Sequence, residues 1–357
     1  MKALVLVLVL VTLTGCITVV PPAEEPPAQG IEAIVFSGGT NALLINFERD
    51  APPDLVYANN HTPFEIIVRV ENDGEFDTTN VNWRITGVNT HDFANLPLTG
   101  SFEDLMVGRT RLEDGIIPGE VSYQWISPSG ELPICYQRSL SDGDGLEMTL
   151  GVNVCYAYAT LASSTVCIRE NYLEGDGCDQ SSQVSVSGAP VTITGFNQQI
   201  VGANRLRLQY DIEARTTANV WAPGPTQTCI GSREDRLKQE NQVYVKMDVN
   251  GLGHVSCNGL ADAIDEFDGE YVFDSENYPQ DTLTGALLNF EGVQNDASGY
   301  IRLDSNGRAS LVCTFTVNET AVDSVGSVDL ALSYFIEDRI TKPITIVSSA
   351  GEYKACE

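Results

Sequence analysis

Histidine is scarce in this sequence of 357 residues, and this limits the catalytic chemistry that the chain can perform. Only His61, His91 and His254 occur. A serine or cysteine nucleophile needs a neighbouring base, and no Gly-x-Ser-x-Gly sequence is present to expose such a serine. His254 and Cys257 have a spacing seen in zinc sites, but a structural zinc needs about four ligands. The sequence therefore predicts no catalytic residues.

Acidic residues between glycines are better suited to binding a cation. Asp142, Asp144 and Glu147 belong to one such segment, and Asp176 and Asp179 belong to another. Hard divalent cations bind several oxygen ligands on flexible loops. The EF-hand pattern is not met, since its sixth position holds Glu147 or Asp179 instead of glycine. Calcium is the one cofactor that these loops suggest, and solvated acidic loops are the alternative.

Carboxylates are so numerous that no single pair indicates an active site. The chain has 49 acidic and 20 basic residues, for a formal net charge of −29. Glycoside hydrolysis requires two carboxylates at a fixed separation in a cleft. A secreted hydrolase that uses the acidic segment 258–298 is therefore kept only as an alternative. The same charge argues against nucleic acid as a partner, because phosphates would be repelled.

Eight cysteines remain when Cys16 is set aside, and their even number predicts four disulfide bonds formed in an oxidising compartment. Four precede residue 188 and four follow it, which favours two bonds in each half of the chain. The eight are Cys135, Cys155, Cys167, Cys178, Cys229, Cys257, Cys313 and Cys356.

Spacing alone does not fix how these cysteines pair. A hairpin turn at Leu161–Ser164 would place Cys155 opposite Cys167. Cys257 and Cys313 lie in or near strand-like segments of the second half, which leaves Cys229 and Cys356 as the remaining pair of that half. The guesses that follow are Cys155–Cys167, Cys257–Cys313 and Cys229–Cys356.

Alternating apolar residues predict short strands along the chain. Apolar residues occupy every second position from Phe64 to Val70, and the pattern returns from Val81 to Ile85. Asn72-Asp73-Gly74 between the two runs predicts a turn in which glycine can take a positive φ. No stretch shows a convincing helical period over three turns. We expect an all-β protein built as sandwiches of antiparallel sheets.

An internal repeat predicts that the chain holds two such sandwiches. Arg205 to Ala222 follows the pattern of Ile67 to Trp83, with an alternating strand, a polar turn, and then Asn-Val or Asn-Val-Asn before a tryptophan. A repeat at roughly 140 residues indicates tandem copies of one domain type. We expect immunoglobulin-like domains over residues 31–188 and 189–357, the second with an acidic insertion at 258–298.

The N-terminus carries an export signal. Ala3 to Leu13 is apolar but too short to span a bilayer, and Leu13-Thr14-Gly15-Cys16 resembles the lipobox of prokaryotic lipoproteins. The resemblance implies a signal peptide over residues 1–15 and a lipid on Cys16. A plain secretory signal is the alternative. Residues 16–30 are rich in proline and predict an extended tether.

Two further triplets fit an exported protein. Asn60-His61-Thr62 and Asn318-Glu319-Thr320 are acceptor sequences for N-glycosylation. We therefore take Asn60 and Asn318 as candidate glycosylation sites, with Asn60 the better of the two because it lies in a polar loop.

The segment Phe64–Trp83 resembles the CARDB-type domains, immunoglobulin-like modules of archaeal envelope proteins. The match rests on Asn72-Asp73-Gly74 after a strand and on Asn80-Val81 at the start of the next. Cys155 to Ile168 also resembles a cysteine-bearing hairpin of archaeal surface proteins. In the second repeat, Ala214-Arg215-Thr216-Thr217 replaces the turn, so the resemblance is weaker there. It implies binding or scaffolding modules and transfers no catalytic residue.

Together these features predict a lipid-anchored archaeal cell-surface protein that binds, adheres or scaffolds without catalysis. Its partners would be the membrane, through the lipid, and other envelope proteins, cell-surface proteins or glycans. A subunit of an extracellular filament or surface layer, joined through exposed edge strands, is the main alternative.

The anchor can be tested by replacing Cys16 with serine. Cys16→Ser removes the thiol that would receive the lipid, so the protein should move from the membrane fraction to the soluble fraction. Mass spectrometry of the unaltered protein should find a modified Cys16 at the new N-terminus. An intact Met1 in that protein would contradict lipidation.

Overall fold

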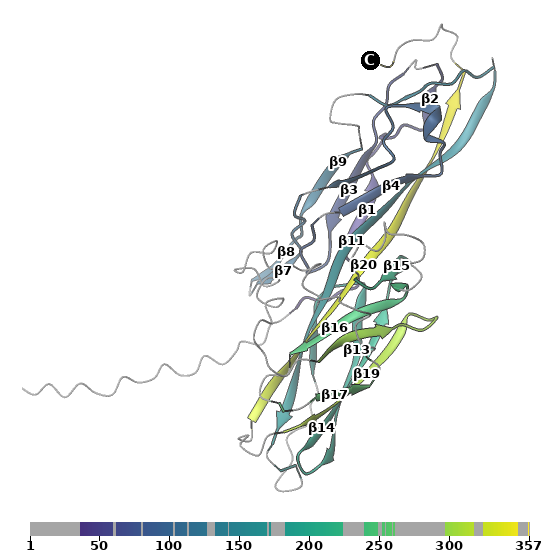
Figure 1. The fold of residues 1–357 in the computed structure, drawn as a ribbon. Helices are drawn as coiled ribbons and strands as arrows, with labels where there is room; N and C mark the ends of the chain where they lie inside the picture. The colour runs from purple at the N-terminus through teal and green to yellow at the C-terminus, as the bar shows by residue number, and fades with distance from the viewer. Residues whose placement is uncertain are drawn as a thin grey trace, which may run out of the picture. The chain divides into compact units, whose positions relative to one another are not determined.

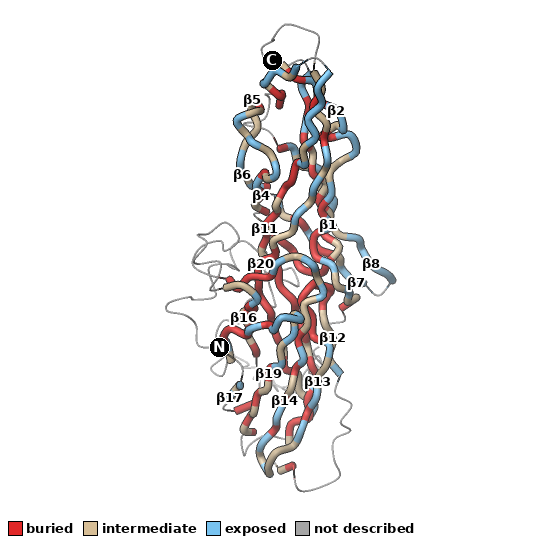
Figure 2. The backbone as a smooth tube through the Cα atoms, turned by 90° about the vertical axis from the view of Figure 1, so that its right-hand side faces the viewer, coloured by how far each residue is buried: buried red, intermediate tan, exposed pale blue. Residues whose placement is uncertain are grey.

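Two long strands form the centre of the fold. β11 (Gly145–Ile168) and β20 (Ser324–Val347) contain 24 residues each. They pair antiparallel along their whole length, from Gly145 opposite Val347 to Ile168 opposite Ser324 (Figure 1). Buried residues follow both strands for much of that length (Figure 2).

The structure is a computed structural model, and it confirms the all-β class. Within the part that it describes, no helix is long and apolar enough to cross a bilayer. The described residues are 36–59, 62–79, 81–102, 104–112, 114–126, 133–141, 143–169, 171–172, 183–223, 239–248, 252–253, 255–258, 260, 297–317, 324–348 and 356.

The largest sheet, which we call the shared sheet, has nine strands. Its main order is β18-β16-β20-β11-β4-β6, while β12 pairs with β11, and β2 and β15 pair with β20. The added strands are β2 (Leu55–Tyr57), β4 (Val81–Thr86), β6 (Thr99–Phe102), β12 (Val184–Val186), β15 (Asn219–Trp221), β16 (Gln242–Asp248) and β18 (Ala297–Arg302).

Two smaller sheets provide further strands for the core. One has the order β1-β3-β9 and the other has the order β13-β14-β19-β17. Their strands are β1 (Leu43–Phe47), β3 (Ile67–Asn72), β9 (Val121–Trp125), β13 (Val191–Gly202), β14 (Arg205–Ala214), β17 (Val255–Asn258) and β19 (Arg308–Thr316). The remaining elements are the pairs β5 (Phe93–Ala94) with β10 (Cys135–Tyr136) and β7 (Thr110–Leu112) with β8 (Gly115–Ile117), and the 3-10 turn η1 (Thr90–Asp92).

The internal repeat is visible in the order of the strands. From β11 outward the shared sheet runs β11-β4-β6, and from β20 outward it runs β20-β16-β18. In the first half the chain passes from β3 in a smaller sheet to β4 in the shared sheet. In the second half it passes from β14 in the other smaller sheet to β15 in the shared sheet. The two repeats are therefore built alike, around the antiparallel pair β11–β20.

The structure does not separate residues 34–357 into two units at residue 188. Residues 34–357 form one unit. One continuous core cluster contains Val68 and Val154 of the first half together with Leu208 and Leu330 of the second. The physical reason is that β20 of the second half pairs with strands of both halves. It pairs with β2 and β11 of the first half and with β15 and β16 of the second.

The predicted hairpin turn at Leu161–Ser164 is wrong for the same reason. These residues continue β11 and pair with Ala331 to Val328 of β20. Ser164 looks like a turn residue in the sequence, yet its hydroxyl is buried and hydrogen-bonded to the Tyr210 hydroxyl at 2.8 Å and to the Val328 carbonyl at 2.9 Å. These tertiary partners allow a polar residue inside a buried strand.

The disulfide pairs are corrected in part. Cys257–Cys313 is present, as predicted, and joins opposite positions of β17 and β19. Cys356 is bonded to Cys135, so the predicted Cys229–Cys356 bond is wrong. This bond joins the two halves of the chain, because the end of β20 lies beside first-half strands such as β2.

The pair Cys155–Cys167 is also wrong. Both cysteines are disulfide-bonded, but they lie on one continuous strand, twelve residues apart. An extended chain separates such positions by about 40 Å, far beyond the reach of a disulfide. Cys178 and Cys229 lie outside the described residues.

Gly74 has a different role from the one predicted. It is not among the glycines with a positive φ. Instead, a Cβ atom at Gly74 would lie 1.8 Å from the Tyr158 hydroxyl oxygen and 2.7 Å from the Asn41 carbonyl oxygen. Glycine is therefore required here because the loop after β3 packs tightly against β11.

This packing predicts the effect of a methyl group at Gly74. Gly74→Ala should lower the free energy of unfolding by about 1–3 kcal/mol, because the added carbon forces buried groups apart. Chemical denaturation measures the change. Gly145→Ala is the control, since the nearest atom to its added carbon is 3.9 Å away. Equal stability of the two variants would contradict the close packing.

Candidate interaction surface

Strand β9 presents three apolar side chains to solvent. Val121, Tyr123 and Trp125 are 40%, 48% and 58% exposed. We call these three side chains the β9 face. β9 ends the order β1-β3-β9, so one of its edges has no neighbouring strand among the described residues. Clusters of exposed apolar residues on a soluble protein often mark an interaction site.

The backbone of β9 is also available at this edge. The Ile126 amide donates to the Ile66 carbonyl at 2.9 Å, and the Glu120 carbonyl accepts from the Asn72 amide at 3.0 Å. In an antiparallel ladder, successive residues direct these groups to opposite sides. The amides and carbonyls of Val121, Tyr123 and Trp125 therefore point to the open edge.

A charged row lies beside the β9 face on the same sheet. Arg69 is opposite Tyr123, and Glu71 is opposite Val121. Hydrogen bonds from the Arg69 guanidinium to Glu71 and Tyr123 raise the pKa of Arg69, so it stays charged. Tryptophan, tyrosine and arginine are the residue types that most often dominate binding energy at protein interfaces. All three are present here.

The hairpin β7–β8 extends the exposed apolar surface of this segment. Leu112, Ile116 and Ile117 are each more than half exposed. Only residues 118–120 separate the hairpin from β9. The chain from β7 to β9 thus exposes six large apolar residues within fourteen positions, 112 to 125.

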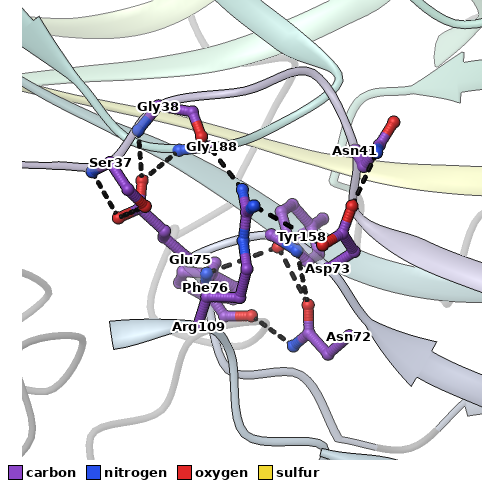
Figure 3. Close-up of polar contacts among 11 residues, drawn as sticks. Ser37, Gly38, Asn41, Asn72, Asp73, Glu75, Phe76, Arg109, Tyr158 and Gly188 are labelled. Carbon is purple, nitrogen blue, oxygen red and sulfur yellow. Dashed lines mark hydrogen bonds and ion pairs between the residues drawn. The ribbon is translucent and has the colours of Figure 1, made fainter. Parts of the chain in front are cut away.

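A buried carboxylate fixes the loops on which this segment depends (Figure 3). Glu75 is 8% exposed. Its oxygens accept from the Ser37 amide at 2.7 Å, the Ser37 hydroxyl at 2.6 Å, the Gly38 amide at 3.0 Å and the Gly188 amide at 2.6 Å. Four donors compensate the loss of water around the charge. Glu75 thereby joins three segments that are distant in sequence.

Asn72 at the end of β3 joins a second set of segments. Its side-chain amide donates to the carbonyls of Phe76 and Met106, both at 2.8 Å. Its oxygen accepts from the Tyr158 hydroxyl at 3.2 Å (Figure 3). Burial raises the pKa of Tyr158 far above its usual range, so this hydroxyl keeps the proton that it donates.

Asp77 and Arg109 connect these loops to β7. Asp77 accepts from the Gly108 amide at 2.7 Å, and burial raises the pKa of Asp77. The Arg109 amide donates to the Gly74 carbonyl at 2.6 Å, and its guanidinium donates to the Gly38 carbonyl at 2.9 Å. Since β7 begins directly after Arg109, buried polar contacts set the position from which the exposed segment starts.

The sequence missed the direction in which β9 faces. The alternating pattern of residues 118–126 predicts the strand itself. In the structure Val121, Tyr123 and Trp125 face solvent, while Ser122 and Gln124 are less exposed. Alternation shows that two faces differ, but it does not show which face another layer covers.

A second candidate is a hollow of about 210 Å³ on the shared sheet, between β4, β6, β11 and β20. Asn82, Arg84, Asn153 and Glu337 line it, and Asn153 donates to the Glu337 carboxylate at 3.3 Å. Trp83, Thr99, Gly100 and Cys155 complete the lining.

The predicted calcium ligands are only partly described. Asp144 and Glu147 are exposed, and Glu147 lies in β11 opposite Thr345 instead of in a loop. Over the described ranges, no three histidine, cysteine or acidic side chains form a metal-binding group. The predicted sites outside the described residues are Cys16, Asn60, Asp142, Asp176, Asp179 and Asn318, together with most of the acidic segment 258–298.

Comparisons with known proteins give no reliable relative. No family model matches the chain, and no curated protein matches it. Red sea bream transglutaminase has a TM-score of 0.19 and 10% identity, over 87% of this chain and 32% of that one. The secreted serine protease VesC from Vibrio cholerae has a TM-score of 0.15 and 9% identity, over 82% and 50%. This chain spans about a third to a half of their lengths, and such scores support no conclusion.

The buried carboxylate can be tested with Glu75→Gln. One acceptor oxygen would become an amide group that faces donors, so the free energy of unfolding should fall by about 1–3 kcal/mol. Glu71→Gln is the matched control, because it alters a partly exposed ion pair worth about 0–1 kcal/mol. Thermal denaturation compares the two, and an equal, small loss in both would contradict the role of Glu75.

Proposed function

We propose that this protein is a non-catalytic, lipid-anchored surface protein of the cell envelope, and that it binds its partner through the β9 face. The observation that carries the proposal is an open strand edge with exposed Val121, Tyr123 and Trp125. Exposed apolar side chains lower the solubility of a protein. They are favourable where a binding partner covers them.

The rest of the molecule suits a scaffold for such a surface. The ladder of β11 and β20 and the bonds Cys135–Cys356 and Cys257–Cys313 make a cross-linked body. Disulfide bonds are typical of oxidising compartments outside the cytosol. The lipobox-like sequence at Cys16 and the proline-rich tether support attachment to a membrane.

An assembling subunit of a filament or surface layer is the second candidate, and the open edge of β9 favours it. Unpaired backbone groups at a sheet edge are a template for a strand from another chain. The hydrolase alternative remains a hypothesis about segment 258–298.

The binding surface can be tested with Trp125→Ala. If the β9 face forms the interface, the variant should bind isolated envelope fragments about tenfold or more weakly, because a large aromatic anchor is lost. Co-sedimentation with envelopes measures binding, with Cys16→Ser added to every variant so that the lipid does not hold the chain in the pellet. Leu98→Ala is the control, since Leu98 is also 58% exposed but lies outside the face. Unchanged binding by Trp125→Ala, or an equal loss in both variants, would contradict the proposal.

A further inference from the structure

We propose that the partner of β9 is the β9 strand of a second copy of this chain. Two copies would pair antiparallel about a two-fold axis at Tyr123 and form one continuous sheet, β1-β3-β9-β9-β3-β1. This inference rests on the proposed function and names the occupant of the open edge beside the β9 face.

The open backbone groups define a single full register. Val121, Tyr123 and Trp125 carry the amides and carbonyls that point to the open edge. With Tyr123 opposite the partner's Tyr123, each Val121 lies opposite a partner's Trp125. All three positions are then hydrogen-bonded pairs, in which both residues exchange an amide and a carbonyl. A shift of two residues leaves one of these positions unpaired on each copy.

The side chains fit the same register. On the exposed side, the small Val121 lies opposite the large Trp125 of the other copy, twice, with a pair of tyrosines between them. Aromatic pairs and aromatic pairs with β-branched residues are favourable across antiparallel strands. The two-fold axis makes this contact closed, so it produces a dimer and no open chain of subunits.

Charge favours a second copy at this position over other faces of the molecule. Two chains of net charge −29 repel each other. β9, with the sequence VSYQW, contains no acidic or basic residue. It also lacks the lysine and proline that usually protect an edge strand. An uncharged edge allows approach where most of the surface opposes it, and added salt should strengthen the dimer by screening that repulsion.

Cysteine cross-linking of the full chain tests the register. In the proposed dimer, the two Tyr123 Cα atoms lie about 5.5 Å apart, within reach of a disulfide. Tyr123→Cys should therefore form a reducible covalent dimer under mild oxidation. Trp125→Cys alone should not, because its two copies would be about 13 Å apart. A mixture of Val121→Cys and Trp125→Cys should cross-link. Equal cross-linking of all variants, or none in Tyr123→Cys, overturns the proposal.

Sedimentation velocity of the full chain in mild detergent gives an independent test without cysteine. The unaltered chain and Tyr123→Phe should dimerise with rising concentration, and more so at higher salt. Tyr123→Lys should stay monomeric, because it places two ammonium groups on the axis. Its melting temperature should fall only slightly, because the change removes the Arg69 hydrogen bond at a half-exposed position and leaves the backbone pairing of β9 with β3 in place. A monomeric unaltered chain, or a Tyr123→Lys variant that dimerises equally, overturns the proposal.

The two proposals can fail separately. If Trp125→Ala loses envelope binding while the unaltered chain stays monomeric, the β9 face binds a different partner and only the dimer is refuted. If Trp125→Ala binds envelopes normally and Tyr123→Cys fails to cross-link, both are refuted.

Discussion

The antiparallel ladder between β11 and β20 is the constraint on which the rest of this structure depends. Each strand supplies positions to both halves of the chain, so neither half can complete its part of the shared sheet without the other. Antiparallel pairing over 24 residues also fixes a single register, because one face of each strand is buried along much of its length. The two halves should therefore unfold together, unlike tandem domains joined by a linker.

The ladder also explains how the repeat is organised. Two sequence repeats usually give two bodies in succession, each with its own core. Here each repeat contributes one long strand to the other, and the strand orders on the two sides of the ladder correspond. Cys356 follows β20 back to the first half and is bonded to Cys135 there, which is why a count of cysteines by halves fails.

Buried and exposed polar groups have opposite roles around β9. Asn72 at the end of β3, and Glu75 and Asp77 in the loop after it, are buried where every unpaired donor or acceptor is costly. Neighbouring backbone groups satisfy them. This fixes the segment that leads into β7. At the edge of β9 that has no neighbouring strand among the described residues, the backbone groups can instead pair with an incoming strand. The buried contacts of this loop thus hold β9 in place, while its edge can bind a strand of another chain.

The sequence by itself determined the class of the fold and much of its core. Alternation at period two placed Val68, Val70, Val81 and Trp83 inside, and all four are buried. Such patterns are local, because they record which side of a strand is apolar. Only the tertiary structure decided that β11 continues through Leu161–Ser164, where the sequence predicts a hairpin turn. Ser164 is accommodated there by hydroxyl and carbonyl partners 46 and 164 residues away.

The β9 face was also decided at the tertiary level. The sequence VSYQW predicts a strand with an apolar side, but whether that side meets a core or water depends on which layers the chain places around it. Gly74 was likewise decided by a tertiary contact. A glycine in a turn suggests a positive φ, but glycine is required at this position because the Tyr158 hydroxyl, 84 residues away in the sequence, packs against it. Local sequence patterns do not predict contacts between distant segments, because such contacts form only when the whole chain has folded.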